Sequence, residues 1–169
     1  MEYESVSHSW LALTENLKSL NSLQNWIKSL YNDPIAKILI NNSNLTKTQL
    51  ETLLIDVGSN HLSDKRLKIE EKAKLRLKGE ISKGAFNRIL RQARRNIIRS
   101  IYTLILLQYV GLIELSTIKK YLELSEKLKD YLEALKSREI EATTLEALKE
   151  ELKSLLSELA EPRRLKGSM

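Results

Sequence analysis

Apolar residues recur at steps of three and four along most of this chain, which is the spacing of one face of an α-helix. The pattern is clear from residue 4 to residue 31, where it includes Trp10, Leu17 and Leu30. Only five glycines and two prolines interrupt the 169 residues. Strand signals are nearly absent, and the one short candidate is residues 111–115. The sequence therefore predicts an all-α fold.

The first break in the helical pattern is "YNDP" at residues 31–34, because Pro34 disfavours helix in the residue before it. A short apolar segment follows, and the polar run "NNSN" at residues 41–44 predicts a turn. Residues 1–44 are therefore expected to form an N-terminal helical segment.

Residues 45–114 predict a core of three helices. The first begins at Thr46, which matches a capping box together with Gln49. The third begins after Ser82 and ends at Gly111, a residue type that commonly terminates helices. We expect these helices at residues 46–57, 63–78 and about 83–110.

The C-terminal residues 115–161 carry a heptad pattern typical of coiled coils. The residues at the a and d positions that we expect to form a dimer interface are Tyr121, Leu124, Leu128, Tyr131, Leu135, Leu145, Leu152, Leu156 and Leu159. Arg138 and Lys149 interrupt the pattern, so a helical hairpin and one long rod are both compatible with it. We expect this arm to pair with a second copy of the chain, and packing back on its own domain is the alternative. The basic tail, residues 162–169, is expected to be mobile.

Composition disfavours most enzymatic chemistry. The chain has no cysteine, so it has no disulfide, thiol nucleophile or cysteine-based zinc site. Its two histidines, His8 and His61, lie far apart without carboxylates at ligand spacing, which argues against metal binding. No phosphate-cradling loop and no Ser/His/Asp order is found. We therefore expect neither an enzyme nor a bound cofactor.

The longest apolar run is "IYTLILLQYVGLI" at residues 101–113, which is too short to span a bilayer. We expect it to be a buried core helix. The first ten residues are acidic and lack the apolar stretch of a secretory signal. These features predict a cytoplasmic, nucleoid-associated protein without a membrane partner.

Charge is distributed unevenly along the chain. Residues 63–100 hold 13 Lys/Arg against four Asp/Glu, whereas residues 122–161 hold six Lys/Arg against eleven Asp/Glu. The chain therefore has a basic middle and an acidic C-terminal arm. A concentrated cationic segment attracts a phosphate backbone, although it can also be no more than a solvated face.

The predicted helix at 83–110 has two different faces when each residue is turned by about 100°. One face carries the apolar side chains Phe86, Leu90, Ala93, Ile97 and Leu104. The opposite face carries Arg88, Arg91, Arg95 and Arg99. After residue 100 the helix becomes apolar almost all round. We therefore expect a surface helix with a cationic edge in its first half and a buried helix in its second half.

The segment "GEIS" followed by "KGAFNRIL" offers a glycine, an apolar residue and a capped helix start, as a helix-turn-helix requires. "LTKTQLETLL", "IEEKAKL" and "ISKGAFNRILRQAR" resemble the three helices of helix-turn-helix transcription regulators of archaea and bacteria. The resemblance covers about residues 45–100. One departure is that Gly79 follows the small residue Ala73 by six positions instead of three or four. Either the second helix is one turn longer than in those regulators, or the segments are matched to the wrong helices.

The resemblance implies roles for individual residues. Base-reading side chains would be Lys83, Asn87, Arg88 and Arg91, because Asn and Arg make bidentate contacts to adenine and guanine. Phosphate-binding residues would be Lys65, Arg66, Lys68, Lys78, Ser82, Arg94, Arg95 and Arg99.

These observations favour a helical domain with a helix-turn-helix core and a C-terminal coiled-coil-like helical arm. Its expected function is sequence-specific binding of double-stranded DNA by a homodimeric transcriptional regulator. One alternative is a small subunit or scaffold of a ribonucleoprotein that grips an RNA or single-strand backbone without reading sequence. A second alternative is a coiled-coil adaptor that binds only proteins.

Overall fold

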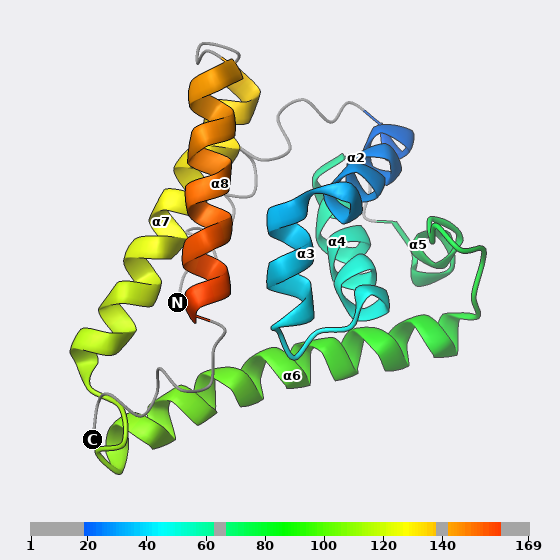
Figure 1. Cartoon of the computed structure of the whole chain (residues 1–169). Coiled ribbons are helices and arrows are strands. Elements are labelled where there is room, and N and C mark those ends of the chain that lie inside the picture. Colours follow the sequence, from blue (N-terminus) through cyan, green and yellow to red (C-terminus); the bar gives the residue numbers. More distant parts are fainter. Residues whose placement is uncertain (1–18, 63–66, 138–141, 160–169) are drawn as a thin grey trace. The chain divides into compact units, whose positions relative to one another are not determined.

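The computed structural model describes residues 19–62, 67–137 and 142–159 of the chain. These residues form seven α-helices and no strand (Figure 1), so the predicted all-α fold is confirmed. They divide into two compact units. The first contains the described residues up to Asp33 and Ser43–Ile97, and the second contains Pro34–Asn42 and the described residues from Ile98 onward. The segment 45–114 is therefore shared between the two units.

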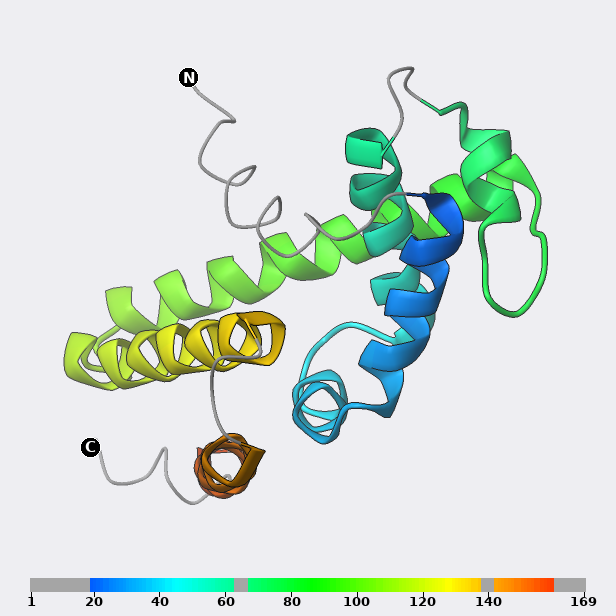
Figure 2. The ribbon, with the colours of Figure 1, turned by 90° about the horizontal axis from the view of Figure 1, so that it is seen from above.

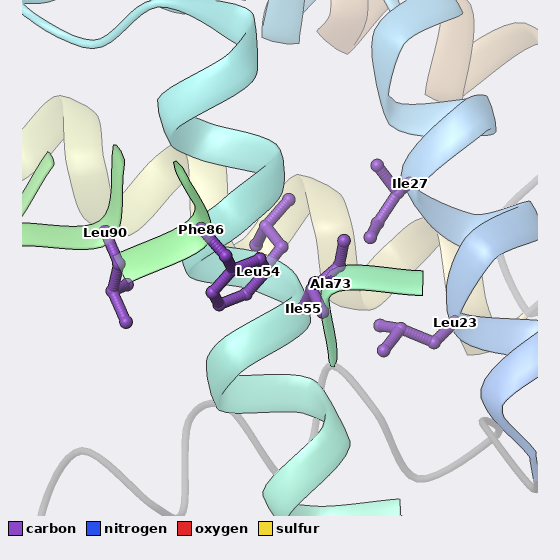
Figure 3. Close-up of a cluster of buried hydrophobic side chains, with 7 residues drawn as sticks. All are labelled: Leu23, Ile27, Leu54, Ile55, Ala73, Phe86 and Leu90. Atoms are coloured by element: carbon purple, nitrogen blue, oxygen red, sulfur yellow. The ribbon is translucent and has the colours of Figure 1, made fainter. Parts of the chain in front are cut away.

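The first unit is built from α2 (Leu20–Asn32), α4 (Lys47–Leu62), α5 (Ile69–Lys74) and the part of α6 (Lys83–Tyr109) that precedes Ile98. Its core is a cluster of apolar side chains from all four helices (Figure 3), namely Leu23, Ile27, Leu54, Ile55, Ala73, Phe86 and Leu90. Burial of these side chains supplies the main driving force for folding of the unit.

Side-chain caps set the helix starts where the sequence predicts them. The Thr46 hydroxyl accepts from the Gln49 N–H at 3.2 Å, and the Gln49 side chain accepts from the Thr46 N–H at 3.1 Å. The Ser82 hydroxyl accepts from the Ala85 N–H at 3.2 Å at the start of α6. The expected end of α4 at residue 57 is wrong, because the helix continues to Leu62.

The second predicted helix of the core is wrong in its extent. Its described part is a helix only over Ile69–Lys74, and residues 75–82 form a connection in which Gly79 has φ +108°. Backbone groups of this connection bond to other helices. The Leu77 N–H donates to the Glu51 carboxylate at 2.6 Å, and the Gln24 amide donates to the Leu75 carbonyl at 2.9 Å. The second helix is thus shorter, and the expected tight turn is a long connection.

The second unit contains α3 (Pro34–Asn41), α7 (Leu115–Ser137), α8 (Ala142–Leu159) and the end of α6. Figure 1 shows α7 and α8 side by side in this unit, and Figure 2 views the same pair down the axis of α8. Its buried core consists of Ile35, Leu124, Tyr131, Leu152 and Leu156, with Leu128 packed partly buried against it. The heptad residues of this cluster, Leu124, Tyr131, Leu152 and Leu156, are therefore already covered within the chain, which is the alternative arrangement to pairing with a second copy.

Other members of the predicted dimer seam are placed differently. Tyr121 is exposed, and the side chains of Leu135, Leu145 and Leu159 lie outside the described set. The basic tail, the first 18 residues and residues 63–66 also lie outside the described residues.

The C-terminal half of α6 contradicts the sequence-based expectation most clearly. The helix ends at Tyr109, just before Gly111, which the sequence predicts as its terminating residue: Gly111 has φ +72°, and the Leu112 N–H donates to the Leu107 carbonyl at 2.9 Å. The expected burial is wrong, however. The exposed side chains include Ile97, Ile98, Ile101, Tyr102, Leu104, Ile105, Leu106, Tyr109 and Val110. Among the described residues, the apolar side chains of α7 pack with α8 and α3 instead, and no side chain of α6 belongs to that cluster.

Candidate nucleic-acid interface

The N-terminal half of α6 is anchored by its apolar side. Phe86 and Ala93 are fully buried and Leu90 is nearly so, as the sequence predicts. The Asn96 amide donates to the Asn44 carbonyl at 2.9 Å and to the Gln49 side chain at 3.3 Å. These bonds hold α6 against the start of α4 and fix which side of the helix faces outward. Asn96 is a positioning residue that no sequence pattern singles out.

Three arginines lie on the outward side of this anchored segment. Arg88, Arg91 and Arg95, which we name the outer arginine stripe, are all exposed. Their spacing of three and four residues keeps them on one helical face. Among the described residues, no acidic side chain forms an ion pair with any of them. Such unneutralised guanidinium groups are suited to bind phosphate or the acceptor edge of a base.

Two other predicted DNA-binding residues already have partners within the chain. Lys83 pairs with Glu70 at 2.8 Å, and both side chains are exposed. The hydrogen bond from Lys83 holds the pKa of Glu70 below its usual range. Arg94 pairs with Asp56 at 2.7 Å. These two cations lie on the flank of α6 nearer the core and contribute less free positive charge than the outer arginine stripe.

The remaining predicted residues fall into separate groups. Asn87 is half-buried, whereas Lys68 and Lys78 are exposed. The Ser82 hydroxyl is engaged as the helix cap. Arg99 is exposed on the part of α6 that belongs to the second unit. Lys65 and Arg66 lie outside the described residues.

A buried polar cluster supports this helix, and it is not among the sites expected from the sequence. Lys72 on α5 donates to the Asp56 carboxylate at 2.7 Å, the Asp56 carbonyl at 3.1 Å and Asn60 at 2.8 Å. All three N–H groups of its ammonium are therefore satisfied. Asp56 also accepts from Arg94 through its second oxygen at 2.7 Å. One carboxylate thus links α4, α5 and α6.

Arg76 forms the second part of the cluster. It pairs with Glu51 at 3.0 Å and donates to the Thr52 hydroxyl at 3.1 Å. A signal for the cluster does exist in the sequence: Gln49, Thr52, Asp56 and Ser59 recur at steps of three and four, and all are buried. This is the spacing of a core stripe, but polar residues occupy it.

No family model, curated protein or solved structure matches this chain. Within the described ranges, no group of three His, Cys, Asp or Glu side chains is placed to hold a metal ion. None of the described helices has the length and apolar character needed to cross a bilayer.

Proposed function

We propose that this chain binds double-stranded DNA through the outer arginine stripe of α6 and acts as a transcriptional regulator of the helix-turn-helix type. The observation that carries the proposal is the outer arginine stripe itself. Its three arginines are exposed, lie opposite a buried apolar face and have no acidic partner among the described residues. A helix held in this way can enter the major groove of DNA with its arginine side chains facing the DNA.

Arg88 and Arg91 are the candidates for reading bases, with Asn87 beside them on the helix. Arg95 lies one turn further on and is suited to a phosphate. The anchoring of α6 through Asp56 and Asn96 supports a defined approach to the duplex, because both residues fix the helix against α4. The proposal of transcriptional control rests on the resemblance of residues 45–100 to such regulators.

A second candidate is binding of an RNA or single-strand backbone without sequence readout. It is favoured by the engagement of Lys83 with Glu70 and of Arg94 with Asp56, which leaves fewer cations to read bases. The long connection over residues 75–82 also differs from the tight turn of the regulators that the sequence resembles.

Selection from a random pool of duplexes, repeated at two salt concentrations, separates the two candidates. A regulator enriches one sequence, and the Arg91→Ala variant relaxes the choice at one position with a cost of about 1–3 kcal/mol. Lys120→Ala, which removes an exposed cation of α7, is the control and leaves the enriched sequence unchanged. Equal enrichment of all sequences, with a steep salt dependence, would favour the backbone binder. Absence of binding to any nucleic acid at moderate salt contradicts both.

A further inference from the structure

The C-terminal half of α6 presents apolar side chains to solvent on nearly every side. Tyr102 is 68% exposed and Tyr109 is 86% exposed. A helix that is apolar all round is normally buried, and a contiguous exposed apolar patch larger than a few hundred Å² marks an interaction surface. We therefore expect another molecular surface to cover these side chains.

The most regularly spaced part of this surface is a stripe of four residues. Ile98, Tyr102, Ile105 and Tyr109, which we name the α6 seam, follow one another at steps of four, three and four. This is the d–a–d–a spacing of two heptads, and it places the four side chains within about 60° of one another around the helix. All four are exposed, and all belong to the second unit.

We propose that the α6 seam pairs with the α6 seam of a second copy of this chain in antiparallel orientation. The seam alternates an isoleucine with a tyrosine. An antiparallel pair with its two-fold axis between Tyr102 and Ile105 sets each isoleucine opposite a tyrosine of the second copy. Ile98 faces Tyr109, and Tyr102 faces Ile105. Every layer then combines a smaller and a larger side chain, which is the arrangement that fills a helix interface. A surface that complements itself in this way suits a two-fold dimer.

Charge favours the antiparallel orientation over the parallel one. The same heptad register continued toward the N-terminus falls on Arg95 and Arg91. A parallel pair would set each of these arginines against its own counterpart, and like charges at such positions repel. In the antiparallel pair these arginines lie beyond Tyr109 of the second copy, where its α6 ends, so neither arginine faces its own counterpart. The outer arginine stripe also stays free of the interface.

The available surface is large enough for a stable dimer. Twelve large apolar side chains between Ile98 and Leu122 are 41% to 86% exposed. At about 150 Å² for a complete side chain, their exposed surface is on the order of 1,000 Å². Each partner in a standard protein interface contributes about 800 Å². These side chains lie on several sides of α6 and on α7, so pairing along the α6 seam buries part of this surface, and side chains that flank the seam must supply the rest of one partner's share.

Sedimentation of the full chain without nucleic acid tests whether the dimer exists. The expected mass is twice the 19.5 kDa of one chain, and Ile105→Glu should return it to the monomer. Thr103→Glu places the same charge on another side of α6 and should leave the dimer intact. Helical content, measured by circular dichroism, must be equal in both variants. A monomeric wild-type chain overturns the proposal. This also holds if the monomer binds vesicles of anionic lipid, because the apolar surface would then face a membrane instead of a second copy. An Ile105→Glu chain that stays dimeric overturns it as well.

Disulfide cross-linking tests the orientation, because the natural chain contains no cysteine. Ile98→Cys and Tyr109→Cys chains are oxidised separately and as a mixture. Antiparallel pairing brings residue 98 of one copy beside residue 109 of the other, so only the mixture should form disulfide-linked dimers. In that pairing, two copies of residue 98 lie roughly 16 Å apart along the axis, beyond the reach of a disulfide. Cross-linking of each variant with itself would instead establish a parallel pair and overturn the proposed orientation.

Discussion

Two groups of basic residues in the first unit look alike in the sequence and differ in the structure. Lys72 and Arg76, the inner pair, are buried and bound to Asp56 and Glu51. The outer arginine stripe is exposed and has no acidic partner among the described residues. Both groups lie within the basic segment 63–100. A count of charges along the sequence therefore combines cations that hold the fold with cations that can meet a ligand.

The difference follows from the cost of burying charge. Removing an ion from water costs several kcal/mol even after the protein relaxes, so a buried ion needs both a counterion and satisfied hydrogen bonds. The carboxylates that satisfy the inner pair belong to α4 and lie outside the basic segment. The outer arginine stripe keeps its hydration and its net charge. Only such charge raises the local concentration of a polyanion.

The largest expected effect comes from breaking the inner pair. Lys72→Met keeps the length of the apolar stem but removes the buried ammonium that pairs with Asp56, so that Arg94 alone still bonds to this carboxylate among the described cations. We expect the free energy of unfolding to fall by about 3 kcal/mol, the lower end of the range for a broken buried ion pair, because the 60% exposed Arg94 compensates the charge of Asp56 only in part. Urea denaturation measures the change. Lys74→Met, which alters an exposed lysine of the same helix, is the matched control. Equal stability of the two variants would mean that Lys72 is not a structural cation.

The second effect concerns the outer arginine stripe. We expect Arg88→Gln, Arg91→Gln and Arg95→Gln together to weaken DNA binding by about 100-fold, or about 2.7 kcal/mol, at moderate salt. The slope of log K against log salt should decrease by about 0.9 for each phosphate that the variant no longer neutralises. Stability should change by no more than about 0.5 kcal/mol per site, since exposed side chains are replaced. Fluorescence anisotropy at several salt concentrations measures the binding.

A paired control shows whether this weakening is specific to the stripe. Lys119→Gln with Lys120→Gln removes two exposed cations from α7. Its effect on the salt slope should be negligible. A loss of binding equal to that of the arginine variant would show that overall charge, and not the outer arginine stripe, attracts the nucleic acid.

Local signals made part of this structure predictable. The caps at Thr46 and Ser82, the helix end at Gly111 and the buried side of α6 all depend on residues within a few positions of one another. The outward direction of the outer arginine stripe follows from the same local periodicity. These features are specified by the spacing of residues in the sequence, so they can be predicted from it.

The remaining features depend on residues far apart in sequence. The helix α5 ends early because Glu51 and Gln24 bond to the backbone of Leu77 and Leu75. No local pattern near residue 75 encodes those partners. The heptads of α7 likewise specify an apolar face but not the helix that covers it. Burial of the apolar run at 101–113 is a wrong expectation for the same reason, since composition does not reveal which neighbour is present.

Arg94 lies between the two groups, because it is both exposed and paired with the buried Asp56. Its side chain is 60% exposed, so solvent weakens the pair, and we expect Arg94→Gln to lower stability by about 1 kcal/mol. For the Arg94→Gln variant, the slope of log K against log salt in DNA binding should match that of the wild type. Arg95→Gln, one residue away, should show the reverse: unchanged stability and a smaller slope. If both variants reduce the slope equally, Arg94 binds phosphate despite its partner.

The smallest effect tests the surroundings of the inner pair through Tyr31. Its hydroxyl donates to the Lys47 carbonyl at 2.8 Å. Burial, reinforced by the negative charge of Glu51, raises the pKa of Tyr31 to about 12 from an ordinary value of 10.0. Tyr31→Phe removes this hydrogen bond, so we expect a stability loss of about 1 kcal/mol at neutral pH.

The pH dependence of that loss follows from the direction of the pKa shift. The folded chain holds the phenolic proton more tightly than the unfolded chain. The resulting stabilisation is complete below pH 10 and is lost as the pH rises through about 12. The wild-type advantage over Tyr31→Phe should therefore shrink between these two values. Urea denaturation of both proteins across this range measures it. A constant difference would show that neither burial nor the charge of Glu51 raises the pKa of Tyr31 in the folded chain.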